Sequence, residues 1–434
     1  MQNTAEASFN ELVEKYLGGP LPRDMTDRIS MSEHPAEAKK FVVRALKLMN
    51  RSNYPITSLS PYFIHWLSTI KTILPSAWGG QIPPITLPDR HRKLDAYIKN
   101  QTRFKGKKAL VFLDMGCGFP PITASDTAKA LTDWQVYGVD YSFPDYIVYD
   151  KEGHYACFDK SGRYQYFQAL MSRNGRALYQ DPTATRKYFT RLFSTLKDQG
   201  VPFPGKTLKL FEKDGCRLIR NHVLNFESEN LCLIKSDIKD IRLPPVMVIR
   251  CMNVHVYFDP DTRKKMVAQA GKFLERDGLM IVGTNGLAIQ ARYFVYEKKK
   301  EGLACKAFAF SPDNLGPISF MPWFTLHEND PEALALSRLS RIIRSHETFW
   351  PEFSNAVDRL LAEKGICRRR GDHFFQVPAQ ELLPREYMAR GAAIWQELDS
   401  KGYVDGAVEV LNKAGYEAWK NPVGDIAVNP LSVF

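Results

Sequence analysis

The sequence predicts an α/β protein built around a mainly parallel, seven-stranded sheet that ends in an antiparallel hairpin. From residue 108 onward, short apolar runs alternate with helical patterns, which is the rhythm of βαβ units. Two apolar runs, at 291–296 and 304–310, flank a charged turn and indicate the hairpin. A chain of 434 residues exceeds what one hydrophobic core usually supports, so we expect further segments around this sheet.

Residues 1–100 are expected to form a helical N-terminal region. Pro35 begins an amphipathic segment that runs through Met49, and Ser60 begins a second one that runs to Ile70. Neither segment carries recognisable chemistry. The stretch 76–88 contains prolines and paired glycines, and it is interpreted as a linker or loop.

The seven expected strands are short apolar runs at 110–113, 135–139, 231–234, 246–251, 279–282, 291–296 and 304–310. A helix is expected at 122–131, between the first two strands. The best-marked helix begins at Asp259 and Pro260, because aspartate caps the first turn and proline suits the first helical position. Gly278 is expected to end this helix before the next strand.

Residues 143–230 are expected to be an inserted small β/α subdomain, because one crossover needs far fewer residues. Aromatic runs around 151–153 and 160–162 predict a small antiparallel meander, and a helix is expected at about 183–199. After the hairpin, residues 313–434 are expected to be mostly helical, with an αβ unit at 406–428. The predicted domains are therefore 1–100, 101–312 with its insertion, and 313–434.

The net charge of +11 favours acidic or anionic partners, which include small molecules, protein surfaces and nucleic acid. Charge alone does not choose among them. The seven cysteines are scattered and show no metal-ligand spacing, so we expect no metal site and a reducing, cytoplasmic location. The first residues lack the pattern of a secretory signal, and the apolar stretch 62–74 is too short to span a bilayer. The oligomeric state is left open.

The strongest motif is ALVFLDMGCGFPP at 109–121, in which a buried strand ends at Asp114 and a glycine-rich turn leads into a helix. Gly116 and Gly118 allow a sharp turn and let a ligand approach the backbone closely. The next strand ends at Asp140, where a carboxylate can accept hydrogen bonds from a ribose diol. This combination predicts a nucleoside-containing ligand, whereas a routine glycine turn is the alternative.

This string and VYGVDYS at 136–142 resemble motifs I and II of the class I S-adenosylmethionine-dependent methyltransferases. The resemblance implies a Rossmann-like fold with S-adenosylmethionine as the cofactor. A dinucleotide is the weaker interpretation, because Pro120 and Pro121 stand where the fingerprint G-x-G-x-x-G would continue.

Residues 231–283 resemble the later motifs of that family in the same order. The segment CMNVHVYF at 251–258 is most similar to the fourth-strand motif of the chemotaxis-receptor glutamate methyltransferases, with Asn253 and Tyr257 at matching positions. The chain departs from that subfamily at Met252, where an arginine is usual, and motif I lacks the usual acidic pair. The resemblance covers about residues 108–310.

The resemblance also implies a set of cofactor-binding residues. Asp237 would contact the adenine amino group, and Ile238 would lie beside the adenine ring. The full expected set is Asp114, Gly116, Cys117, Gly118, Asp140, Tyr141, Asp237, Ile238, Cys251 and Asn253.

Methyl transfer from a sulfonium needs mainly in-line positioning and exclusion of water. An acceptor over the carboxyl end of the fourth strand makes Asn253, His255 and Tyr257 the candidate catalytic residues. For His255, alternation along VHVYF offers packing as the alternative. Cys117 and Cys251 are interpreted as small packing residues, while Trp323 and Phe324 either line a substrate pocket or belong to the core.

The sequence therefore predicts methyl transfer to a small molecule or a protein side chain. An RNA or other nucleic-acid methyltransferase is the alternative that the positive charge permits, but the chain lacks the N/D-P-P-Y/F motif and any recognition-helix signature. A second alternative is a module that binds S-adenosylmethionine without turnover. The intact glycine motif and the two carboxylates at 140 and 237 argue against it.

Overall fold

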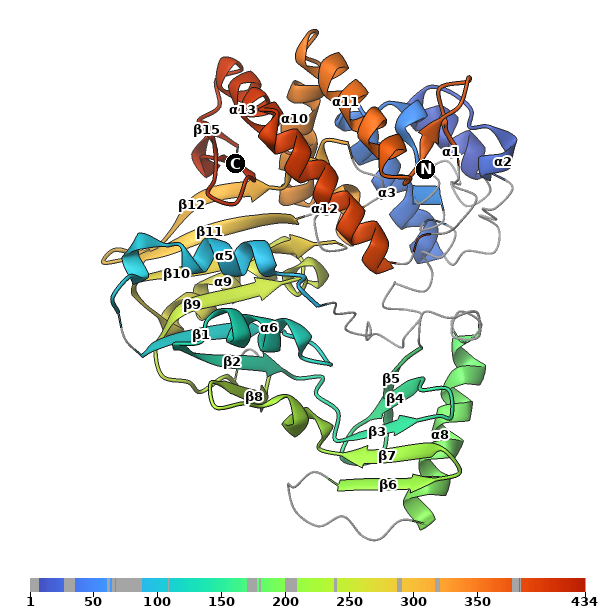
Figure 1. The fold of residues 1–434 in the computed structure, drawn as a ribbon, viewed down its shortest axis with the longest axis vertical. Helices are drawn as coiled ribbons and strands as arrows, with labels where there is room; N and C mark the ends of the chain where they lie inside the picture. Colours follow the sequence, from blue (N-terminus) through green and yellow to red (C-terminus); the bar gives the residue numbers. More distant parts are fainter. Residues whose placement is uncertain are drawn as a thin grey trace. The chain divides into compact units, whose positions relative to one another are not determined.

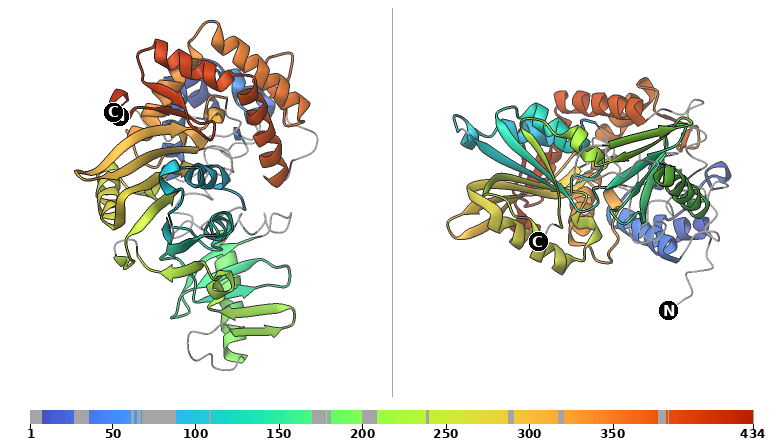
Figure 2. Two further views of the ribbon diagram at one scale, coloured as in Figure 1. Left: turned by 60° about the vertical axis from the view of Figure 1, so that its left-hand side comes forward. Right: turned by 90° about the horizontal axis from the view of Figure 1, so that it is seen from below.

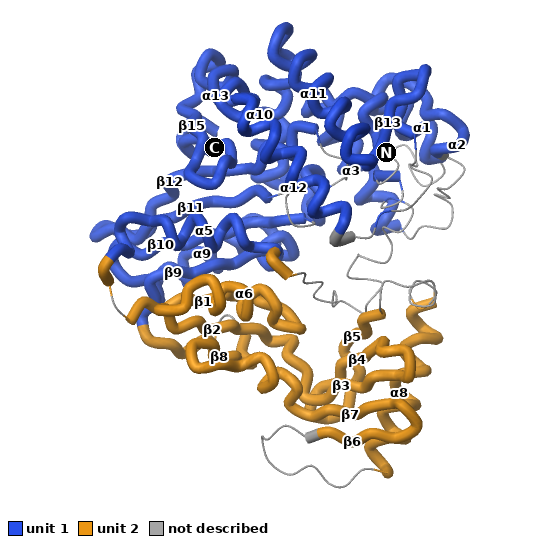
Figure 3. The backbone as a smooth tube through the Cα atoms, in the orientation of Figure 1, with its two compact units in different colours: residues 1–70, 90–105, 245–434 blue, residues 71–89, 106–244 orange. Residues whose placement is uncertain are grey.

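The computed structural model is a mixed α/β protein that divides into two compact units (Figure 3). The larger unit comprises Met1–Ile70, Arg90–Lys105 and Pro245–Phe434, and the smaller unit comprises Lys71–Asp89 and Gly106–Pro244. The structure describes residues 8–26, 36–60, 63–64, 67, 88–107, 109–169, 178, 181–199, 209–237, 240–286, 291–316, 321–376, 382 and 384–433.

The sheet of the larger unit places its strands in the order β15-β16-β12-β11-β10-β9 (Figure 1). These strands are β9 (Val246–Met252), β10 (Leu274–Asn285), β11 (Ala291–Lys299), β12 (Gly302–Phe310), β15 (Ala418–Lys420) and β16 (Ile426–Val428). Strands β9 and β10 are parallel, and all the other pairs in this unit are antiparallel. Every residue of β9 is buried, which explains its continuous apolar sequence.

The crossover from β9 to β10 differs from the expectation at its end. Helix α9 (Pro260–Phe273) begins as predicted, since the Asp259 carboxylate accepts hydrogen bonds from the backbone of Asp261 and Thr262. The prediction that it continues to Gly278 is wrong, because Leu274 already pairs with Val246 and the register shifts before Leu279. A side chain at Gly278 would lie 2.9 Å from the Met247 carbonyl, so this glycine permits a close backbone approach within the sheet.

The C-terminal residues add both helices and strands to the larger unit. The helices are α10 (Pro331–Arg344), α11 (Phe349–Glu363), α12 (Pro384–Ser400) and α13 (Tyr403–Lys413). Phe308 and Phe310 of β12 share a buried core with apolar residues of these helices and of β16. The predicted αβ unit at 406–428 corresponds to α13, β15 and β16. The prediction of a seven-stranded sheet did not include these two strands, and β16 pairs with β12 through Phe308 and Val428.

The N-terminal helices of the larger unit are α1 (Phe9–Leu17), α2 (Arg23–Thr26), α3 (Ala36–Arg51) and α5 (Arg92–Lys99). Helix α3 matches the first predicted amphipathic segment and buries Phe41, Val42 and Leu46. The second predicted segment and the predicted linker fall almost wholly outside the described residues. Within the described part of the chain, no helix combines the length and the apolarity needed to cross a membrane.

The smaller unit contains three parallel strands in the order β1-β2-β8. They are β1 (Leu110–Met115), β2 (Trp134–Asp140) and β8 (Leu231–Lys235), with helix α6 (Ile122–Ala130) between the first two. A side chain at Gly138 of β2 would lie 3.1 Å from the side chain of Ala124, so α6 packs closely against this strand.

A five-stranded antiparallel sheet completes the smaller unit, with α8 along one face (Figures 1 and 2). Its strands are β3 (Tyr146–Tyr149), β4 (Tyr155–Phe158), β5 (Tyr164–Gln168), β6 (Lys209–Lys213) and β7 (Cys216–Arg220), in the order β5-β4-β3-β7-β6. Helix α8 (Pro182–Gln199) buries Phe189 and Phe193 against Val148 and Phe158. Strands β3, β4 and β5 occupy the aromatic runs for which the sequence predicts a meander.

Candidate functional site

The glycine-rich turn of the smaller unit is fastened to the end of β2. Gly116 and Gly118 adopt φ values of 72° and 73°, a left-handed conformation that glycine tolerates. The amides of Gly116 and Cys117 donate to the Val139 carbonyl at 2.7 and 3.3 Å. These two amides already donate within the protein, so they are not available to donate to a ligand. The turn instead allows a ligand to approach the backbone closely.

Asp140 closes this arrangement with its side chain. One carboxylate oxygen accepts the Gly118 amide at 2.8 Å, and the other accepts the backbone and hydroxyl of Ser142 at 2.7 and 2.5 Å. Burial raises the pKa of Asp140, while the hydrogen bonds from Ser142 and Gly118 oppose that rise. A carboxylate offers about four acceptor positions, so the three bonds leave room for one more donor, such as a ribose hydroxyl.

Asp114 and Cys117 lie inside the same turn. The Thr123 hydroxyl, in the first turn of α6, donates to the Asp114 carboxylate at 3.2 Å and lies 3.4 Å from the Cys117 carbonyl. Asp114 therefore links the end of β1 to the start of α6. The Cys117 side chain is buried, and its sulfur would contact any side chain at Gly138 at 3.1 Å, which agrees with a packing role.

Tyr141 and Asp237 are the exposed members of the expected cofactor residues described in this unit. The Tyr141 side chain is 59% exposed, and burial together with the Asp140 and Asp237 carboxylates raises its pKa. The backbone of Ser236, which precedes Asp237, donates to the Asp140 carbonyl at 3.3 Å. Asp140, Tyr141 and Asp237 thus share one end of β2 and β8, while Ile238 lies outside the described residues.

In the larger unit, Asn253 joins the carboxyl ends of β9 and β10. Its φ of 62° is one that asparagine tolerates better than most residues. The Asn253 carboxamide accepts the Asn285 amide at 2.9 Å and donates to the Asn285 side-chain oxygen at 2.6 Å. This reciprocal pair fixes the orientation of Asn253, and Cys251 is buried just before it in β9.

Arg90 and His91 contact Asn285 of the same pair, and no sequence pattern singles them out. The Arg90 guanidinium donates to the side-chain and backbone oxygens of Asn285 at 3.1 and 2.8 Å. The Asn285 carboxamide in turn donates to the His91 Nδ1 atom at 3.1 Å. Burial holds the pKa of His91 well below its usual value, and Arg250 and Arg90 lower it further, so His91 is the neutral acceptor.

Tyr257 lies near this cluster and is accessible, with 39% of its side chain exposed. Burial lowers the pKa of Arg90 to about 10, and Tyr257 acts in the opposite direction by favouring the charged guanidinium. The two side chains therefore interact electrostatically. An accessible hydroxyl beside a buried cation suits a group that orients an acceptor or takes its proton.

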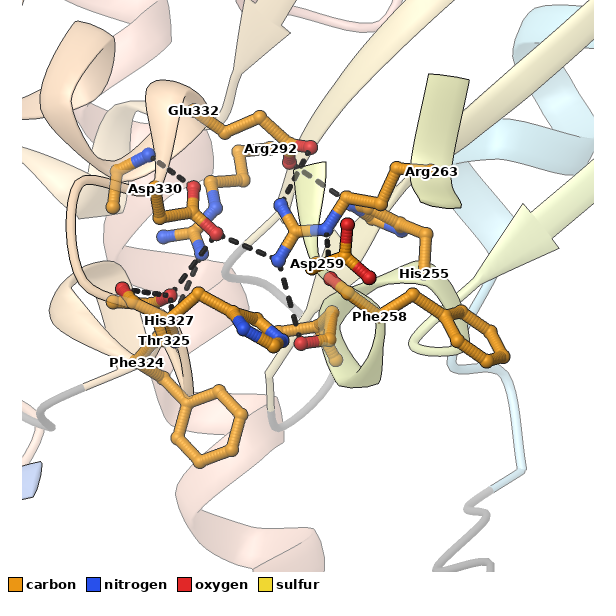
Figure 4. A network of polar contacts seen from close by, with 12 residues as sticks. His255, Phe258, Asp259, Arg263, Arg292, Phe324, Thr325, His327, Asp330 and Glu332 are labelled. Carbon is orange, nitrogen blue, oxygen red and sulfur yellow. Dashed lines mark hydrogen bonds and ion pairs between the residues drawn. The ribbon is translucent and has the colours of Figure 1, made fainter. Parts of the chain in front are cut away.

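His255 points into a buried ion network instead (Figure 4). It is 2% exposed, and its Nε2 atom lies 3.0 Å from the Glu332 carboxylate. Arg263 lies between two carboxylates, 3.3 Å from Glu332 and 2.7 Å from Asp330. Burial raises the pKa of Asp330, but Arg292 and Arg263 outweigh it and hold that pKa at about 2. The packing interpretation accounts for this placement of His255.

Trp323 and Phe324 belong to the core of the larger unit. The Trp323 ring lies 4.7 Å from the Tyr54 ring, and the Phe324 ring lies 5.4 Å from the Phe41 ring of α3. Both side chains are buried. Among the described residues, no group of three or more histidine, cysteine, aspartate or glutamate side chains has the arrangement of a metal site.

Comparison with known proteins gives structural matches only. No protein-family model and no curated protein matches the chain. A methyltransferase from Clostridium acetobutylicum that depends on S-adenosylmethionine aligns over 51% of this chain and 65% of its own, with a TM-score of 0.21. The plantazolicin methyltransferase BpumL, in complex with SAH, aligns over 83% and 95% with a TM-score of 0.24. An O-methyltransferase family 2 protein from Planctomyces limnophilus, in complex with apigenin, aligns over 98% and 90% with a TM-score of 0.25. All three are 11% identical to this chain.

Proposed function

We propose that this chain is a methyltransferase that binds S-adenosylmethionine and transfers its methyl group to a small molecule or a protein side chain. The observation that carries the proposal is the Asp140 carboxylate, which is hydrogen-bonded to the Gly118 amide of a strand-turn-helix motif and keeps one acceptor position. When bound, the cofactor supplies a methyl group on a sulfonium, which is already electrophilic.

The residues of the smaller unit are assigned to the adenosyl part of the cofactor. Asp140 accepts a hydrogen bond from the ribose, and the glycines at 116 and 118 let the ligand approach the backbone. Tyr141 is exposed beside Asp140 and Asp237, and Asp237 with Ile238 is assigned to the adenine. Asp114 and Cys117 hold the shape of the turn through Thr123 and Gly138.

The strand-end residues of the larger unit are assigned to positioning. Asn253 is held by Asn285, and it orients the reacting groups, while buried Cys251 fixes the end of β9. Tyr257 orients the acceptor or takes its proton, aided by the charge of Arg90. His255 holds the segment 253–257 in place through its contact with Glu332.

A titration with S-adenosylhomocysteine tests the cofactor assignment. Asp140→Ala removes a charge-assisted hydrogen bond, so the affinity measured by calorimetry should fall about tenfold or more. Asp140→Asn keeps the size of the side chain and separates the loss of charge from the loss of shape. Asp133→Ala is the matched control, because Asp133 is an exposed carboxylate that precedes the opposite end of β2. Equal affinities in all four proteins would refute the assignment.

A transfer assay with a radioactive methyl group tests the reaction class. The full-length protein is incubated with labelled S-adenosylmethionine and fractions of a cell extract. Label in small molecules or protein supports the proposal. Label in nucleic acid selects the alternative that the charge of +11 permits, and cofactor binding without any transfer selects a binding module.

A further inference from the structure

A small pocket lies at the carboxyl end of β10. It is lined by Thr284, Gly286, Ala291, Arg292, Asn314 and Met321. All six residues belong to the larger unit. Gly286 and Ala291 are small, which leaves space beside the two polar side chains of the sheet.

Thr284 and Arg292 are brought together by the strand register. They are directly opposite partners in the antiparallel pair of β10 and β11. Directly opposite residues project to the same face of a sheet with their Cβ atoms about 5 Å apart. The hydroxyl of Thr284 and the guanidinium of Arg292 are therefore neighbours in one pocket.

Both side chains carry a polar atom that finds no partner in the described part of the chain. The Thr284 hydroxyl and the Arg292 Nε atom are buried and make no hydrogen bond there. The other two nitrogens of the guanidinium donate to the carbonyls of Pro322 and Phe324 at 2.6 and 2.8 Å, so Arg292 is firmly held. Both residues are buried, with Thr284 5% and Arg292 3% exposed. A buried donor without a partner is costly, which indicates that a bound group completes it.

The chemistry of the two donors selects the class of that group. Arg292 is a permanent cation that acts together with Arg263 on the buried Asp330 carboxylate, while its Nε atom has no partner among the described residues. One N–H and one hydroxyl, side by side, match the two oxygens of a carboxylate. A phosphate has more oxygens and more charge than two donors satisfy.

We propose that this pocket binds a carboxylate of the methyl acceptor through Arg292 and Thr284. The inference rests on the proposed function, because it names the class of molecule that the enzyme would methylate. It makes the acceptor an anionic molecule or side chain, in agreement with the positive charge of the chain.

Titration of the full chain with sodium acetate, observed by saturation-transfer NMR, tests the pocket. Thr284→Val keeps the branched shape and the strand preference but removes the hydroxyl, so acetate should bind about tenfold more weakly, as expected for one charge-assisted hydrogen bond. Ser337→Ala is the matched control, because Ser337 is also a buried hydroxyl without a partner among the described residues but does not line the pocket. It should bind acetate like the unchanged protein.

Acetamide and inorganic phosphate are the comparison probes. Acetamide, which has the shape but not the charge of acetate, should not bind. The inference is overturned if acetate does not bind the unchanged protein, which is the result expected when the pocket holds only water. It is also overturned if Thr284→Val binds acetate equally well, or if phosphate or acetamide binds the unchanged protein as tightly as acetate does. Titration of the same proteins with S-adenosylhomocysteine keeps the two proposals apart. If the unchanged protein binds acetate but not S-adenosylhomocysteine, only the methyltransferase proposal is defeated.

Discussion

Among the candidate catalytic side chains, Tyr257 combines exposure with a neighbouring cation. Tyr257→Phe should lower turnover by up to about a hundredfold, because a positioned proton acceptor contributes on that scale. Affinity for S-adenosylhomocysteine should change less than twofold. Phe258→Leu is the control, since Phe258 is adjacent and similarly exposed, at 37%. Steady-state kinetics of both variants decide the matter, and unchanged turnover in Tyr257→Phe would remove the tyrosine from the mechanism.

The individual residues of the site were only partly predictable. Asp140 and Asn253 follow apolar strands, so their places at strand ends could be predicted from the alternation of apolar and polar runs. Arg90 could not, because it reaches Asn285 from a segment that is remote in the sequence and has no periodic pattern. The burial of His255 could not be predicted either. Its partner Glu332 comes from α10, so the local pattern around 251–258 could not reveal that the imidazole is buried.

At the scale of secondary-structure elements, Gly278 controls how α9 passes into β10. Gly278→Ala should lower the free energy of unfolding by about 1–3 kcal/mol, because the new methyl group would meet the backbone carbonyls of Glu275 and Met247. Chemical denaturation measures the change. Gly371→Ala serves as the control, because a side chain there meets no atom within 4 Å. Equal stabilities of the two variants would show that the sheet accommodates a methyl group at position 278 without loss of stability.

The elements themselves were largely predictable where one local signal dominates. Strand β9 is buried throughout, so its apolar run is continuous, and Asp259 caps α9 as its position before a proline suggests. The β3–β4 and β4–β5 turns repeat the pattern Asp-Lys-x-Gly, and in each the aspartate accepts two backbone amides. The pairing of β16 with β12 was missed, because it joins distant segments and leaves no local pattern.

For the molecule as a whole, Asp313 should make stability depend on pH. Burial raises the pKa of Asp313 to about 7 from its ordinary value of 3.8. A hydrogen bond from Ser311 and the charge of Lys93 oppose this rise, and Asp425 adds to it. Between these two values the folded state binds the proton more tightly than the unfolded state. The free energy of unfolding should therefore fall as the pH rises from about 4 to about 7.

Asp313→Asn isolates this contribution, because it keeps the size of the side chain but cannot ionise. Thermal unfolding of both proteins should show a smaller decline over that pH range in the variant. Parallel pH profiles would mean that Asp313 titrates alike in both states. Asp330 acts at the acid end in the opposite sense, since its pKa of about 2 protects the folded state until the pH falls below about 4.

The bonds between Asp140, Gly118 and Ser142 have a consequence for how the empty protein behaves. One carboxylate ties together the loop after β1 and the segment after β2, so the receptive shape exists before any ligand arrives. Little conformational entropy is then lost on binding. The Gly118 amide should exchange slowly with deuterium even in the apoprotein, and a change at position 140 should alter both the proposed contact with the cofactor and the rigidity of the loop after β1.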